Sequence, residues 1–147
     1  MSVIQLVKAN IDDSELLFFW ANDDDVRKNS FNTDKIIYEN HLEWFKNKLC
    51  SEGTFIYILK ENYNPIGVVR LEKNDNESMI ISYSIDKKHR GKGHGTELLG
   101  IIKEKFLEYN LIGKVKKDNI SSIKAFKNAG YFMKEKLDCF VFYSKGD

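Results

Sequence analysis

The sequence contains few cysteines, which can cross-link a fold, and few prolines, which can interrupt helices and strands. Its 147 residues include two cysteines, Cys50 and Cys139, and a single proline, Pro65. The cysteines stand alone, without CxxC or Cys/His ligand spacing. We therefore interpret both as reduced, partly buried residues that form no disulfide, metal site or nucleophile. Internal repeats and low-complexity tracts are also missing, which argues against linkers. We expect residues 1–147 to form a single domain with one core.

An excess of charge of one sign is absent too, as are long apolar runs. Lysine and arginine number 23, and aspartate and glutamate number 22, so the overall charge favours neither a nucleic acid partner nor an anionic membrane. The longest apolar runs, such as residues 16–20, are far shorter than the roughly 20 residues of a membrane span. The N-terminus does not show the basic segment and apolar stretch of a secretion signal. We therefore expect a soluble, cytoplasmic protein that binds neither nucleic acid nor membranes.

Hydrophobic periodicity predicts strands and helices along the whole chain. Strands are expected at residues 3–7, 54–59, 66–71, 79–85, 112–115 and 139–143, and helices at residues 14–20, 34–49, 93–109 and 119–130. Residues 22–33 are expected to form a polar loop. The three central strands follow one another through short turns, which predicts an antiparallel meander. The strand at 79–85, the helix after it and the strand at 112–115 then form a parallel, right-handed unit.

The most informative segment is the loop that follows residue 85 and opens directly into a helix at residues 93–96. Glycines at positions 91, 93 and 95 let successive backbone N–H groups turn inward, and the first N–H groups of the new helix are unpaired. This construction predicts an anion site. A P-loop is excluded because no lysine stands between Gly95 and Thr96. A dinucleotide fingerprint is excluded because Thr96 and Leu98 stand where its third glycine would be.

Two motifs resemble the GNAT N-acetyltransferase superfamily. The pattern R-x-x-G-x-G at residues 90–95, after an antiparallel strand, is similar to the acetyl-CoA pyrophosphate loop of that family. The segment Asn119–Tyr131 resembles the family's N-x-x-S/A helix with its following glycine-aromatic pair. The order of expected elements agrees over essentially the whole chain. The resemblance implies an α/β (α+β) protein with the GNAT fold, in which helices flank both faces of a mixed, mostly antiparallel sheet.

The resemblance also implies acetyl-CoA as the co-substrate and no metal. The main chain of residues 85–87 would pair with the pantetheine arm like another strand, and the N–H groups of residues 91–96 would hold the pyrophosphate. Arg90 and Lys92 would add positive charge, and Asn119 would face the cofactor arm. The implied cofactor-binding residues are Ile85, Asp86, Lys87, Arg90, Gly91, Lys92, Gly93, His94, Gly95, Thr96, Asn119, Ser122 and Phe126.

The catalytic groups depart from the family pattern. Acetyl transfer needs a free amine, a donor for the oxyanion and a proton for the leaving thiolate. Where many members have a tyrosine that protonates the thiolate, this chain has Phe126, and where some have a glutamate base it has Lys114. Positioning alone can supply on the order of 7 to 11 kcal/mol, so a dedicated base is not indispensable. The replacement candidates are Glu72, His41, Ser82, Tyr83 and Ser84, of which Glu72 and Ser84 are our predicted catalytic residues.

The amine acceptor is indicated by a looser resemblance. Residues 20–31 and 41–45 are similar to the sugar-nucleotide N-acetyltransferases of pseudaminic acid biosynthesis, in which this region walls the acceptor pocket. A nucleotide-linked amino sugar would need a cation and hydrogen-bond donors. The implied acceptor residues are Arg27, Asn29, His41 and Tyr83. A structural role stays open for each, for example an ion pair at Arg27 or an aromatic neighbourhood at His41.

Two other functions and the oligomeric state also stay open. Enzymes with the same core acetylate a protein N-terminus or a ribosomal protein. A domain that binds acyl-CoA without turnover would fit the missing tyrosine. A homodimer is a further option, because the aromatic residues at positions 18, 19, 44, 132 and 140 could either form a surface patch or fill the core.

Overall fold

The computed structural model describes residues 2–146, which form one seven-stranded sheet with the order β1-β2-β3-β4-β5-β7-β6. The strands are β1 (Ile4–Lys8), β2 (Thr54–Glu61), β3 (Asn64–Lys73), β4 (Ser78–Ile85), β5 (Asn110–Lys116), β6 (Phe132–Glu135) and β7 (Cys139–Tyr143). The helices are α1 (Ser14–Ala21), α2 (Asp24–Asn29), α3 (Tyr38–Cys50), α4 (His94–Lys105) and α5 (Ile120–Asn128). Short 3-10 helices at Ile11–Asp13 and Lys87–His89 precede α1 and the loop before α4.

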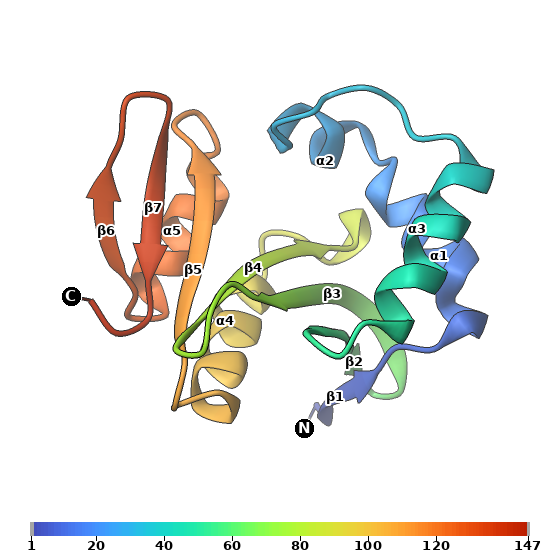
Figure 1. The fold of residues 1–147 in the computed structure, drawn as a ribbon, viewed down its shortest axis with the longest axis horizontal. Helices are drawn as coiled ribbons and strands as arrows, with labels where there is room; N and C mark the ends of the chain where they lie inside the picture. The colour runs from blue at the N-terminus through green and yellow to red at the C-terminus, as the bar shows by residue number, and fades with distance from the viewer. Residues whose placement is uncertain (1, 147) are drawn as a thin grey trace.

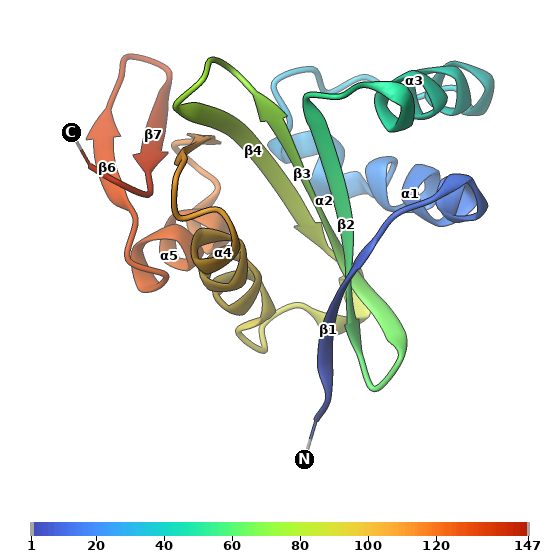
Figure 2. The ribbon, with the colours of Figure 1, turned by 60° about the horizontal axis from the view of Figure 1, so that its bottom comes forward.

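The sheet separates two layers of helices (Figures 1 and 2). Helices α1, α2 and α3 lie on one side of β2–β4, and α4 and α5 lie on the other. Because side chains alternate along a strand, each face of the sheet has its own apolar cluster. One joins Leu17, Trp20, Phe45, Ile56 and Ile58 under α1 and α3. The other joins the opposite face of β3 and β4 to α4 and α5. The expected mixed, mostly antiparallel sheet with helices on both faces is confirmed.

The strands β4 and β5 run parallel but stay together at one end only. Their register covers Ser78–Ile80 against Asn110–Ile112, whereas β4 pairs with β3 as far as Ile85. Beyond Ile80 the two strands diverge (Figure 1). The N–H of Asp86 donates to the carbonyl of Ile66, so in this antiparallel ladder the main-chain groups of residues 83 and 85 point away from β3. β4 therefore presents a main-chain edge to the gap.

Several local expectations were wrong. Residues 22–33 are not all loop, because the Asp23 side chain accepts from the N–H groups of Asp25 and Val26 and starts α2. The next helix begins at Tyr38 rather than at residue 34. The edge strand β6 was missed because all four of its residues are exposed and give no alternation.

The surface residues also correct two expectations. Both cysteines are free, but Cys50 is exposed rather than partly buried. Of the aromatic residues considered for a dimer face, Phe19 and Phe132 are exposed, and they belong to α1 and β6 at opposite ends of the sheet (Figure 1). They form no single patch, so a dimer through them stays a prediction. Among the described helices, none has the length and apolar character needed to cross a membrane.

Candidate active site

The glycine loop after β4 has the geometry of an anion cradle. Gly91 and Gly93 have φ angles of 77° and 84°, in the left-handed region. No heavy atom lies within 4 Å of a β-carbon built at either position, so the backbone conformation, not crowding, requires glycine there. Gly93 is the N-cap of the 12-residue helix α4. The first N–H groups of that helix therefore face the open side of the loop with the positive end of the helix dipole.

Gly95 serves a different purpose from the other two glycines. A β-carbon at this position would stand 3.2 Å from Cε2 and 3.4 Å from the hydroxyl oxygen of Tyr83, and 3.5 Å from the β-carbon of Ala125. The absence of a side chain therefore lets the first turn of α4 approach both β4 and α5. The Tyr83 phenol lies at this junction.

The charged side chains near the loop have partners within the protein. The Arg90 guanidinium lies 3.1 Å from a carboxylate oxygen of Asp23 and 3.2 Å from one of Asp25, and its Nε donates to the carbonyl of Ile85. The Asp86 carboxylate accepts from the indole of Trp20 and lies 2.9 Å from His89 Nδ1. These contacts attach the loop to α1 and α2. A contact between Arg90 and an anion in the loop stays a prediction that needs the guanidinium to exchange partners.

Residues His94, Lys87 and Lys92 differ in their access to the loop. The His94 ring is buried, with Nδ1 3.2 Å from Glu97 and Nε2 3.8 Å from Glu61, so its main chain and not its ring is available to the cradle. Lys87 and Lys92 are exposed beside the loop.

The second motif borders the gap between β4 and β5. The Asn119 side chain accepts from the N–H of Ser122 and caps α5. The Ser122 hydroxyl lies 3.1 Å from that of Tyr83. Phe126 is only 2% exposed, stacks on Phe142 with centroids 4.8 Å apart, and leaves no room for a β-carbon at residue 113. Its contact with the cofactor stays a prediction, since the structure places its ring in the core.

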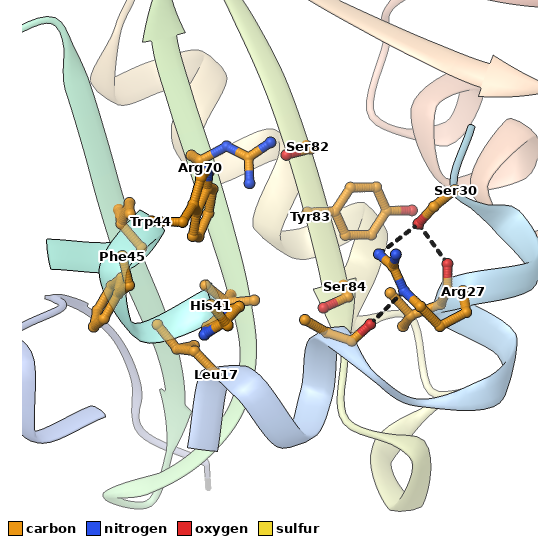
Figure 3. Close-up of a pocket in the computed structure, with 14 residues that line it drawn as sticks. Leu17, Arg27, Ser30, His41, Trp44, Phe45, Arg70, Ser82, Tyr83 and Ser84 are labelled. Carbon is orange, nitrogen blue, oxygen red and sulfur yellow. Dashed lines mark hydrogen bonds between the residues drawn. The ribbon is translucent and has the colours of Figure 1, made fainter. Parts of the chain in front are cut away.

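A pocket of about 230 Å³ lies on the other face of the sheet, under α1, α2 and α3 (Figure 3). Its lining residues are Leu17, Ala21, Val26, Arg27, Ser30, His41, Trp44, Phe45, Ile56, Val68, Arg70, Ser82, Tyr83 and Ser84. None of these lining residues is acidic, and two are arginines. The pocket therefore combines apolar walls with positive charge, while β4 supplies hydroxyl groups.

Arg70 is the cation that the sheet contributes. Its guanidinium lies 4.9 Å from the ring centroid of Trp44, and its Nε is 2.9 Å from Glu72. Burial lowers the pKa of Arg70, and the neighbouring Glu72 opposes that shift. The same carboxylate lies 3.2 Å from Lys48, so two cations share one anion. The neighbourhood keeps a net positive charge.

Arg27 is the second arginine of the pocket and belongs to α2. Its guanidinium donates to the carbonyls of Ala21, Asn32 and Asp34 and to the hydroxyl of Ser30. Three of these hydrogen bonds reach the segment between α2 and α3 and the fourth reaches the end of α1. One side chain can therefore hold that segment against α1, because an arginine fork has five rigid N–H donors. The alternative of an ion pair at Arg27 is wrong, since its partners are carbonyls and a hydroxyl.

His41 is a buried polar side chain of the pocket whose hydrogen bonding is incomplete. It is 6% exposed and lies among the rings of Phe18, Trp44 and Phe45. Its Nδ1 is the one buried side-chain nitrogen or oxygen without a hydrogen-bond partner in the part of the chain described. Burial, and then the charges of Arg27 and Arg70, lower the pKa of His41. The ring is therefore a neutral hydrogen-bonding group near pH 7.

The structure brings together only some of the predicted site residues. Arg27, His41, Tyr83 and Ser84 line the pocket, whereas Asn29 and Glu72 do not. Glu72 is held between Lys48 and Arg70, which suits a positioning role better than that of a base. Sequence reasoning missed Arg70 and its contact with Trp44. An arginine within an otherwise apolar strand was the available signal, because such a side chain needs a buried partner or a ligand.

The comparisons with known proteins agree with this geometry. The family model described as the acetyltransferase (GNAT) domain matches residues 4–131. The chain belongs to this family and is a GNAT-family N-acetyltransferase. No curated protein matches the sequence.

Solved structures with low sequence identity share the fold. Spermidine N-acetyltransferase from Vibrio cholerae, in complex with CoA and spermine, has a TM-score of 0.86 at 15% identity, covering 95% of this chain and 94% of that one. AAC(6')-Ib, in complex with paromomycin and acetyl-CoA, has a TM-score of 0.79 at 19% identity, with coverages of 95% and 90%. RimL, a ribosomal L7/L12 α-N-protein acetyltransferase in complex with CoA, has a TM-score of 0.82 at 13% identity, with coverages of 95% and 92%.

Proposed function

We propose that this enzyme moves an acetyl group from acetyl-CoA to the primary amine of a negatively charged acceptor, most specifically a nucleotide-linked amino sugar. The proposal rests on one observation, the charge of the pocket under α1–α3. Arg27 and Arg70 line it, and none of its lining residues is acidic. Arginine forks match phosphate oxygens geometrically. A diphosphate in the pocket would supply an anion to Arg27, whose partners are carbonyls and a hydroxyl, and to Arg70, which shares its single carboxylate, Glu72, with Lys48.

The two substrates approach the active site from different sides of the sheet. The glycine loop binds the pyrophosphate of acetyl-CoA, and the main-chain edge of β4 binds its pantetheine arm. The acceptor enters from the pocket, where the rings of Trp44 and His41 give flat surfaces for a base or a sugar. The Ser82 and Ser84 hydroxyls could hydrogen-bond the sugar and hold its amine near the thioester. Orientation of this kind supports acetyl transfer without a dedicated base.

Other acceptors fit the pocket less well. Spermine and aminoglycosides, which the similar structures hold, are polycations. In a pocket lined by two arginines and no carboxylate a polycation would meet repulsion, because the nearby Glu72 is already shared by Arg70 and Lys48. A protein N-terminus, as in RimL, would need room for a chain. The specific nucleotide sugar is supported by the charge of the pocket and by the resemblance of residues 20–31 and 41–45.

The test is the release of CoA thiol with matched pairs of amines. Each nucleotide-linked amino sugar is compared with the same amino sugar without its nucleotide, and with spermidine, an aminoglycoside and N-terminal peptides. We expect kcat/KM for the nucleotide-linked sugar to exceed that of the free sugar by at least about tenfold, corresponding to one charge-assisted hydrogen bond. A preference for a peptide or a polyamine would refute the proposal and assign the enzyme to that acceptor class.

A further inference from the structure

Tyr83 belongs to both halves of the active site. It lines the pocket together with its neighbours Ser82 and Ser84. Alternation along β4 directs its side chain to the opposite face, toward α4 and α5. There its ring contacts Phe126 edge-on, with centroids 5.9 Å apart, and its hydroxyl meets that of Ser122. In Figure 3 the phenol extends from β4 away from His41 and Trp44.

The reacting atoms must meet near this residue. The amine arrives from the pocket face of the sheet, whereas the thioester arm lies along the gap where β4 has lost its partner β5. The main-chain groups of Tyr83 point into that gap. Tyr83 therefore has three properties at once. Its main-chain groups face the gap, it lines the pocket, and its hydroxyl lies near the start of α5.

The leaving group needs a proton at this place. A thiolate of CoA resembles that of cysteine, whose pKa is about 8.5, so its expulsion near neutral pH is assisted by a general acid. On α5 the core residue Phe126 offers none, and its ring tip already fills the space where a β-carbon of residue 113 would stand. A hydroxyl on that ring would have to displace the β5 main chain. The Tyr83 phenol, in contrast, lies beside the start of α5, 3.1 Å from the Ser122 hydroxyl, and Tyr83 also lines the pocket.

We propose that the Tyr83 hydroxyl donates its proton to the departing sulfur of CoA and that Ser122 orients it. The amine nitrogen attacks the acetyl carbon, the C–S bond breaks and its electron pair goes to sulfur, which takes the phenolic proton. The proton that the amine nitrogen loses then restores the phenol through the Ser122 hydroxyl. The sum is one amide and one thiol, with no net proton change at the enzyme.

The environment of the phenol agrees with this role. Burial raises the pKa of Tyr83, and the hydrogen bond to Ser122 partly opposes the shift. The phenol thus stays protonated at the pH at which the amine reacts and has its proton to give. A proton acceptor at the same place would require the opposite shift.

The experiment replaces the hydroxyls one at a time. Tyr83→Phe keeps the ring against Phe126 and Gly95 and removes only the acid, and Ser122→Ala removes only the orienting partner. Tyr131→Phe is the matched control, because its phenol donates to the Leu99 carbonyl in the core, away from the gap. We expect kcat to fall by about 10²- to 10⁴-fold in Tyr83→Phe and less in Ser122→Ala, with the KM for acetyl-CoA unchanged.

Two further readouts separate catalysis from packing. The wild type should show a solvent deuterium isotope effect on kcat that Tyr83→Phe loses. It should also bind CoA more tightly than desulfo-CoA, and Tyr83→Phe should bind the two alike. Equal kcat values, or a preference for CoA that survives in Tyr83→Phe, would overturn the proposal. The inference rests on acetyl transfer but not on the acceptor class, and the CoA comparison needs no acceptor, so its failure is distinguishable from failure of the proposed function.

Discussion

The two faces of the active site are built in opposite ways. The cofactor side is a contiguous loop whose contacts are main-chain N–H groups, set by the φ angles of Gly91 and Gly93. The acceptor pocket is made of side chains from α1, α2, α3, β2, β3 and β4. A main-chain cradle depends on conformation and tolerates changes in most side chains. A side-chain pocket keeps its fold when a side chain changes but alters its specificity, so one fold can keep its donor and change its acceptor.

The largest effect that we expect from this difference is on CoA binding, when the conformation of the glycine loop is changed. In Gly93→Val the backbone would leave the left-handed region, at a cost of a few kcal/mol, and the N–H groups would turn away from the anion. We expect CoA to bind about 10- to 100-fold more weakly, measured by calorimetry. Gly100→Ala is the control, because it lies within α4 and its β-carbon meets nothing within 4 Å. Wild-type affinity in Gly93→Val would show that the cradle is not the anion site.

The difference between the two faces also explains what the sequence could predict. The loop was predictable because three glycines, a preceding strand and a following helix are neighbours in the sequence. The pocket was not, because its residues come from six separate elements, and Arg70 of β3, for example, meets Trp44 of α3. The contacts that join the loop to α2 were equally out of reach, since Arg90 meets Asp23 and Asp25 from 67 and 65 positions away. Arg27 and His41 were found through a resemblance. The partners of the Arg27 guanidinium, at residues 21, 30, 32 and 34, required the structure.

The second prediction tests the acceptor side. In Arg70→Gln the pocket loses a cation that stacks on Trp44, while Glu72 keeps its contact with Lys48. We expect kcat/KM for an anionic acceptor to fall by about 10- to 100-fold, as for the loss of a charge-assisted hydrogen bond. The affinity for CoA should stay at the wild-type value.

Arg70→Lys is the matched control, since it keeps the charge but not the fork, and it should lie between the wild type and Arg70→Gln. An unchanged kcat/KM in Arg70→Gln would mean that the acceptor does not contact this side of the pocket. Weaker CoA binding would contradict the separation of the two faces.

A smaller effect concerns stability on the pocket side. The pKa of His41 in the folded protein lies below its ordinary value of 6.5, so the unfolded chain binds the proton more readily. The contribution of neutral His41 is therefore complete above pH about 6.5 and is lost as the pH falls toward the folded-state pKa. In urea unfolding between pH 7.5 and 5, the wild type should lose stability more steeply than His41→Phe. Parallel curves would contradict a buried, neutral histidine.

The smallest effect lies at the contact that joins the two faces. Arg90 of the cofactor loop pairs with Asp23 and Asp25, and α2 walls the acceptor pocket. The Asp25 side chain is 64% exposed, so its ion pair is weak and sensitive to salt. Asp25→Asn removes one of the two carboxylates that hold Arg90 and leaves its contact with Asp23. With less competition for the guanidinium, CoA should bind about two- to fivefold more tightly at low ionic strength. Asp24→Asn is the control, because Asp24 belongs to the same helix but pairs with Lys35. If Asp25→Asn binds CoA no better than Asp24→Asn, Arg90 does not exchange Asp25 for the cofactor, and this ion pair only attaches the loop to α2.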